Sequence, residues 1–165
     1  MRITAVAAAI LISAVCSSAM AQGTNVAFGA FTHDTTQPVE VNAQSLSVDQ
    51  SDGTAIFTGN VVIGQGDMRI TAGEVRVVYA QGSGQGGRIE RLEASGGVTL
   101  VSGAEAAEAR QAVYSIDSGT IVMSGDVVLT QGQNAMSAGR LTVNLKNGTG
   151  VMDGGVKTIL QTGNP

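Results

Sequence analysis

Residues 55–66 read AIFTGNVVIGQG, and this stretch decides the fold that the sequence predicts. Its larger apolar residues recur at every second position, so they point to one face of an extended strand. Gly59 stands in the middle of that apolar face, where a strand normally carries a side chain. Glycine inside a strand favours a bend or a close approach between two backbones. The stretch therefore predicts a long β-strand that bends at its middle.

The same glycine-x-valine step recurs along the chain. It stands at residues 59–61, 96–98, 125–127 and 154–156, at intervals of 37, 29 and 29 residues. A second marker is an alanine within an apolar alternation, at Ala43, Ala72, Ala109 and Ala138, with intervals of 29, 37 and 29 residues. Eight extra residues at 80–87, AQGSGQGG, explain the longer interval and favour a flexible loop inserted between two strands. The chain is therefore a 29-residue repeat.

Each repeat holds two kinds of strand. The glycine-containing kind alternates without interruption, whereas the second kind shifts its apolar phase, as between Ala72 and Val75. We expect the phase-shifting strands to absorb one extra residue in a bulge or corner, so that apolar groups stay inward. Turn signals alternate between the two sides of the repeat, at 52–53, 117–119 and 147–148 and at Gly66, Gly103 and Gly132. The prediction is an all-β fold, an antiparallel β-jelly roll of stacked V-shaped strands, and a small closed barrel is the alternative.

The N-terminus has the pattern of an export signal. Arg2 precedes an apolar run over residues 3–15, and Ala19-Met20-Ala21 supplies the small residues of a cleavage site. An uncleaved membrane anchor and a lipid attached at Cys16 are the alternatives. We expect a signal peptide at 1–21, a flexible leader at 22–34, one β domain at 35–160 and a polar tail at 161–165. Cleavage would place the protein in the periplasm and remove the single cysteine, and with it any disulfide.

The charges and reactive groups argue against two classes of function. Without Arg2 the chain has eight Lys and Arg against thirteen Asp and Glu, scattered singly, so no basic face for nucleic acid is expected. His33 is the single histidine, and no G-x-S-x-G motif occurs. We therefore expect no enzyme activity, no metal and no cofactor.

Several motifs resemble the LptA/OstA family of periplasmic lipopolysaccharide-transport proteins. They are QPVEV at 37–41, FTGNVVIGQG at 57–66, ITAGEV at 70–75 and MSGDV at 123–127, and the resemblance covers about residues 35–158. It implies a β-jelly roll that carries the acyl chains of lipopolysaccharide and bridges inner and outer membrane. It also implies LptC-like and LptD-like partner domains and head-to-tail self-association. An open seam of the folded sheet would leave the sugar headgroup in water.

The inward side chains are the candidate lipid contacts. They are Val39, Val41, Phe57, Val61, Ile63, Val98, Leu100, Met123, Val127 and Leu129. The resemblance itself implies Val39, Val41 and Leu100. An open stack of strands leaves two unpaired edges, and we expect partner contacts there at Val39, Val41, Val156 and Ile159. The alternative is that the inward residues form an ordinary dry core, in a structural or adhesive β-repeat protein of the cell envelope.

Overall fold

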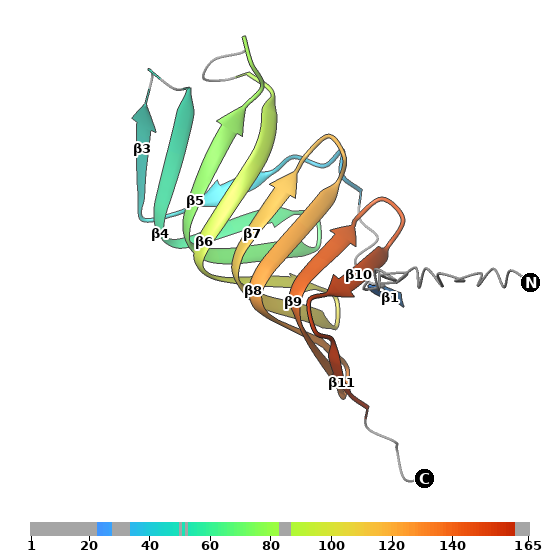
Figure 1. Ribbon diagram of the computed structural model, residues 1–165. Helices are drawn as coiled ribbons and strands as arrows, with labels where there is room; N and C mark the ends of the chain where they lie inside the picture. Colours follow the sequence, from blue (N-terminus) through green and yellow to red (C-terminus); the bar gives the residue numbers. More distant parts are fainter. Residues whose placement is uncertain (1–22, 28–33, 50, 52, 83–86, 161–165) are drawn as a thin grey trace, which may run out of the picture.

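The computed structural model describes residues 23–27, 34–49, 51, 53–82 and 87–160 (Figure 1). The predicted signal peptide, Cys16, His33 and the polar tail lie outside these ranges. Within them every regular element is a strand, and no helix is long and apolar enough to span a membrane. The strands are β1 (Thr24–Ala27), β2 (Glu40–Asn42), β3 (Ser45–Asp49), β4 (Thr54–Gln65), β5 (Met68–Tyr79), β6 (Ile89–Ser102), β7 (Glu105–Ser115), β8 (Thr120–Gln131), β9 (Asn134–Asn144), β10 (Thr149–Asp153) and β11 (Lys157–Ile159).

The strands form one antiparallel sheet. Its order is β1-β10-β9-β8-β7-β6-β5-β4-β2, while β3 also pairs with β4 and β11 also pairs with β9. From β4 to β10 each strand pairs with the next one in sequence, as the alternating turn signals predicted. The path ends at β1 and β2 without closing on itself, so the open jelly roll is confirmed over the closed barrel.

Each long strand bends at its middle, and the bends divide the sheet into two leaves (Figure 1). Leaf A holds the half of β4 that pairs with β3, at 54–58, and leaf B holds the half that pairs with β2, at 62–64. The register shifts between these halves in all five hairpins from β4 to β9. The predicted V-shaped layers are therefore present.

The position of the extra residue corrects one expectation. Across the bend of β4 and β5, Gly59 and Asn60 stand opposite Gly73 alone, because Thr58 pairs with Glu74 and Val61 with Ala72. The bulge thus lies on the glycine-containing strands, not on the phase-shifting ones. Its two residues have positive φ in each copy, for example 83° at Gly59 and 45° at Asn60. Glycine and, with a short polar side chain, asparagine or aspartate tolerate this region, whereas the bulkier residues at 72–75 do not.

The inner faces of the two leaves pack on each other to form the core. Twenty-five apolar side chains are buried there, from Ala55 in β4 to Met152 in β10. Both bend and turn keep the alternation facing this interior, which is why one repeat unit suffices to build the whole stack. The glycine-rich insert lies between β5 and β6, where the Ala80 amide donates to the Arg88 carbonyl at 2.9 Å.

Strand β1 was not expected from the sequence. It lies inside the predicted leader at 22–34 and pairs with β10, at the opposite end of the sheet from β2. The N-terminal part of the chain therefore runs from the last repeat back to the first. At the last repeat, β1 is the edge of leaf A and β11 is the edge of leaf B.

Alanine substitutions at the bend should separate backbone strain from steric contact. Gly96 has φ 78° and its added Cβ would lie 3.2 Å from the Gly73 Cα, whereas a Cβ at Gly125 would meet only the Arg110 side chain. We expect Gly125→Ala to lower the free energy of unfolding by about 1–2 kcal/mol through positive φ alone. Gly96→Ala should cost more, because backbone cannot move aside as a side chain does. Urea unfolding measures both, with Gly64→Ala as the control at ordinary φ; equal losses in all three variants would contradict this account.

Candidate functional site

The predicted lining residues do meet on the inner faces of the two leaves. Phe57 and Met123 lie in leaf A, and the residues from Val61 to Val127 that precede the leaf B turns lie in leaf B. Seven of them are almost fully buried, with exposed fractions of 0–2%: Val61, Ile63, Val98, Leu100, Met123, Val127 and Leu129. Val39, Val41 and Phe57 are half-buried against the same core.

The seam that we expected to be open is closed by packing along the middle repeats. Alanines stand at many inward positions, among them Ala94, Ala107 and Ala112, so the leaves approach closely and fill the space between them. The pockets that the described residues line lie at the bends and on outer surfaces. Apolar matter can therefore enter between the leaves only where the interior reaches the surface, or where the leaves separate.

The interior does reach the surface at the first edge. Leu46 and Val48 of β3 are 54% and 44% exposed, although they pair with Phe57 and Ala55 and so face inward with them. No further strand covers them on leaf A, because β3 ends the sheet there. The sequence alternation contains both residues, but alternation alone does not tell an edge strand from a covered one.

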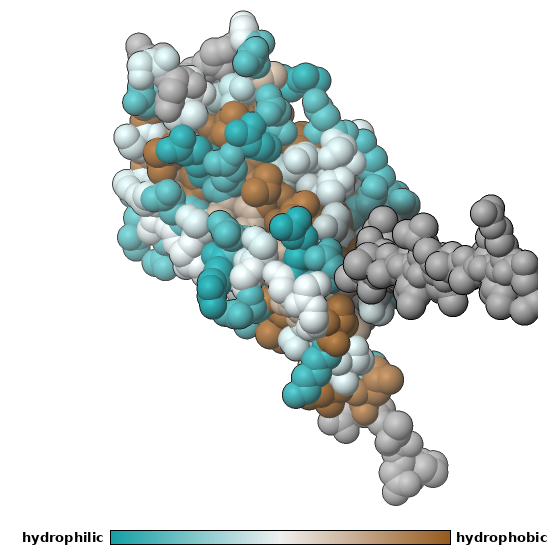
Figure 2. All heavy atoms as spheres, in the orientation of Figure 1, coloured by the Kyte–Doolittle hydropathy of each residue, from teal (hydrophilic) through white to brown (hydrophobic). Residues whose placement is uncertain are grey.

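A second apolar surface lies at the last edge. Ile159 of β11 and the following Leu160 are 54% and 66% exposed, and Val156 just before β11 is half-buried against the core. Figure 2 shows apolar surface gathered near β11, beside the C-terminal end, while the outer face of leaf A is mostly hydrophilic. The four predicted edge residues thus lie at the two opposite ends of the stack.

The two rims of the seam differ in polarity. Leaf A ends in apolar side chains, among them Tyr79, Ile116 and Leu145. The inward face of leaf B ends instead in Gln65, Ser102 and Gln131, which are 37 and 29 residues apart and so occupy one position of the repeat. Gln131 Nε2 donates to Glu105 Oε1 at 2.8 Å, and Glu105 Oε2 is buried without a hydrogen bond.

A buried hydrogen bond joins the two rims. The Tyr114 hydroxyl of leaf A donates to Gln65 Oε1 of leaf B at 2.7 Å, and both residues are 1% exposed. Gln65 Nε2 in turn donates to the carbonyls of Thr35 at 3.1 Å and Gln37 at 2.8 Å. Burial raises the pKa of Tyr114 to about 12, opposed by its hydrogen bond to Gln65, so the hydroxyl keeps its proton at neutral pH. A polar residue at an inward position was the sequence signal for Gln65.

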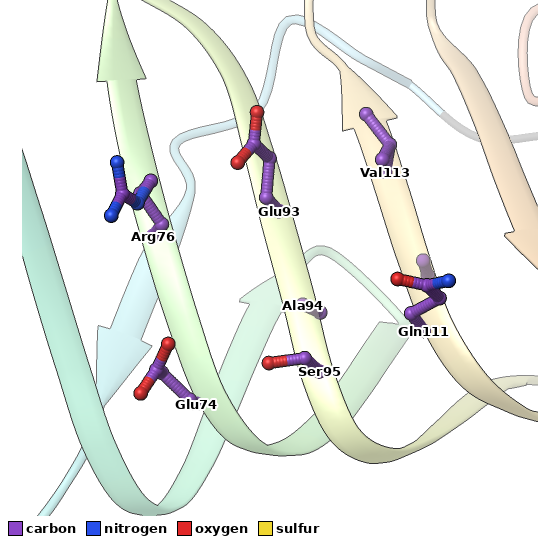
Figure 3. A pocket seen from close by; sticks show the side chains of 8 residues that line it. Glu74, Arg76, Glu93, Ala94, Ser95, Gln111 and Val113 are labelled. Atoms are coloured by element: carbon purple, nitrogen blue, oxygen red, sulfur yellow. The ribbon is translucent and has the colours of Figure 1, made fainter.

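The outer face carries a polar pocket of a different character. Glu74 and Arg76 of β5, Glu93 and Ser95 of β6, and Gln111 of β7 project from three neighbouring strands of leaf A (Figure 3). Opposite charges are interspersed across this water-facing surface, which is typical of a solubilising face. In the described ranges no group of three or more histidine, cysteine or acidic residues is placed to hold a metal ion.

The chain was compared with known proteins. The family described as LptA/(LptD N-terminal domain) LPS transport protein matches residues 40–149. An uncharacterised protein of Rhizobium meliloti (strain 1021) is 32% identical over 115 residues, which are 67% of this chain and 62% of that protein. The lipopolysaccharide export system protein LptA of Escherichia coli (strain K12) is 40% identical over 57 residues, 34% of this chain and 30% of that protein. The matches thus span less than two thirds of these relatives.

The fold has a solved counterpart. The crystal structure of LptH, the LptA-homologous periplasmic component of the lipopolysaccharide transport device of Pseudomonas aeruginosa, matches with a TM-score of 0.67 and 16% identity. The match covers 78% of this chain and 98% of LptH. At this identity the likeness shows a shared jelly-roll architecture. Because the family match spans most of the repeat region, the chain belongs to the LptA/LptD N-terminal domain family of LPS transport proteins.

Proposed function

We propose that this protein binds the acyl chains of lipopolysaccharide between its two leaves and bridges their transport across the periplasm to the outer membrane. Membership of the LPS-transport family carries the proposal. The apolar interior supports it, because this interior runs through every repeat and reaches the surface at Leu46 and Val48. The export signal at residues 1–21 fits the same compartment.

The physical basis is transfer of hydrocarbon out of water. Burying a methylene group is worth about 0.8 kcal/mol, so an acyl chain of ordinary length gains on the order of 9 kcal/mol in an apolar interior. An entering chain replaces the contacts that one leaf makes with the other, so separating the leaves exposes little apolar surface to water once the chain is in place. The sugar headgroup stays at the seam, beside the polar rim of leaf B.

The two ends of the stack suit association with like domains. β2 and β3 leave free backbone groups at one end and β11 at the other, and exposed apolar side chains accompany both. Strand addition at such edges would join consecutive jelly rolls and make their interiors continuous. The partners we propose are LptC-like and LptD-like jelly-roll domains and further copies of this chain, with contacts near Val39, Val41, Val156 and Ile159.

The tightly packed interior favours a second candidate, a structural or adhesive β-repeat protein of the envelope. Exposed fractions of 0–2% at Ile63, Leu100 and Leu129 are those of an ordinary core. The two functions differ in whether lipid reaches these side chains.

Photo-crosslinking distinguishes the two candidates. A small diazirine amino acid at Leu100, which faces inward, should be labelled by lipopolysaccharide, whereas the same group at the neighbouring Val101, 39% exposed on the outer face, should not. Phe57, half-buried at the first edge, should label as well. The yield of the lipid adduct is read by mass spectrometry. Equal labelling at Leu100 and Val101, with the fold intact, would favour the structural protein.

Charged substitutions at the edges test the association. Leu46→Asp and Ile159→Asp each place a carboxylate in an exposed apolar edge surface, so we expect the affinity for a partner jelly roll to fall about tenfold or more, the effect of losing an interface anchor. The monomer should stay folded, since both side chains are more than half exposed. Val128→Asp, an exposed apolar residue on the outer face of the central β8, is the matched control. Sedimentation and site-specific crosslinking measure the complex; unchanged association in both edge variants contradicts the edge contacts.

A further inference from the structure

The segment that precedes β2 lies across the seam between the leaves. Gln65, at the rim of leaf B, binds the carbonyls of Thr35 and Gln37. On the other side, the Thr35 methyl group lies 3.1 Å from the position of a Cβ at Gly119, in the leaf A turn between β7 and β8. Residues 34–38, here called the strap, therefore touch both rims. In Figure 1 the chain leading into β2 crosses behind the leaves from the last repeats towards the first.

The strap has little hold of its own on the core. Its residues 34–37 form a local turn, in which the Gln37 amide donates to the Asp34 carbonyl at 3.2 Å and the Thr36 amide to Asp34 Oδ1 at 3.0 Å. Both contacts stay intact if the strap moves as a unit. The contacts that a moving strap must break are those to Gln65, and the orientation of the Gln65 amide is fixed by the Tyr114 hydroxyl.

We propose that the strap is a gate over the seam and that Gln65 and Tyr114 form its latch, so that an acyl chain enters between the leaves when the latch opens. The proposal rests on the proposed function for the identity of the cargo, but the gate itself is a property of this chain. A single amide links strap, leaf B and leaf A, so loss of its contacts frees the strap and removes a tie between the leaves at the same time.

The energetics suit a gate rather than a permanent clamp. A hydrogen bond of this kind contributes modestly when it forms, because water replaces it in the open state. Leaving one of the partners unpaired in the closed, dry seam disfavours the closed state, while the open state supplies water to the same group. Removing the Tyr114 hydroxyl should therefore raise the ratio of open to closed molecules by about 2- to 13-fold, the factor that corresponds to one such bond.

The decisive comparison is Tyr114→Phe against Tyr79→Phe. Both tyrosines lie near the leaf A rim, and both changes remove one oxygen, but the structure gives a hydrogen bond only to the Tyr114 hydroxyl. Hydrogen exchange of the strap amides at 35–37, followed by mass spectrometry, reports opening without any lipid. We expect exchange to rise by about 2- to 13-fold in Tyr114→Phe and not in Tyr79→Phe. Gln65→Met, which removes all three side-chain hydrogen bonds at similar volume, should exceed Tyr114→Phe.

Uptake is measured in parallel with two probes, fluorescently labelled lipopolysaccharide and the neutral apolar dye N-phenyl-1-naphthylamine. If opening precedes entry and open molecules are rare, the uptake rate of each probe rises by the same factor as strap exchange. Exchange at Met123, in the central β8, monitors global unfolding and should change far less than exchange in the strap.

The outcomes separate the gate from the cargo. Faster strap exchange with faster dye uptake, but no binding of lipopolysaccharide by any variant, supports the gate and removes the proposed function. Strap exchange that is unchanged in both Tyr114→Phe and Gln65→Met shows that the latch does not hold the strap. Faster strap exchange with unchanged uptake of both probes shows that the seam is not the entrance. Either of the last two results overturns the proposal.

Discussion

A strand that bends can keep one apolar face inward on both sides of the bend only if the bend restores the alternation of its side chains. In this protein a two-residue bulge at positive φ does so, opposite a single residue of the neighbouring strand. Every other feature depends on it. Without the bulge, the leaf B halves of the strands would turn their valines and leucines to water, and the two leaves would have no apolar surfaces to pack on each other.

The same arrangement explains why binding and stability compete for one surface. The side chains that best suit an acyl chain, such as Leu100 and Leu129, are those that hold the leaves together in the empty protein. A carrier built this way has no empty slot waiting for cargo, because alanines at inward positions let the leaves close on each other. Its specificity then depends on what opens the seam and on the unpaired ends of the stack, where Leu46 and Ile159 leave apolar surface in water.

Much of the fold could be predicted from the sequence, because its determinants are local and repeated. The period, the bends at Gly59 and its equivalents, the turns at Gly66 and Gly103 and the inward residues from Val61 to Leu129 all appear in the structure where the alternation placed them. The position of the bulge was wrong, since a phase shift between two paired strands shows that one of them has an extra residue but not which one. The positive φ of Asn60 and Asp126 identifies the glycine-containing strands.

The sequence by itself determined the β-strands, their bends and the face of each strand that is apolar, because these follow from side-chain alternation and from the backbone freedom of glycine over a few residues. Only the tertiary structure decided how far the leaves close, which edges stay exposed and what crosses the seam. The bond from Tyr114 to Gln65 joins residues 49 apart in sequence, and β1 pairs with β10 from the far end of the chain. Such contacts depend on how the finished leaves approach each other, and no local pattern in the sequence records that distance.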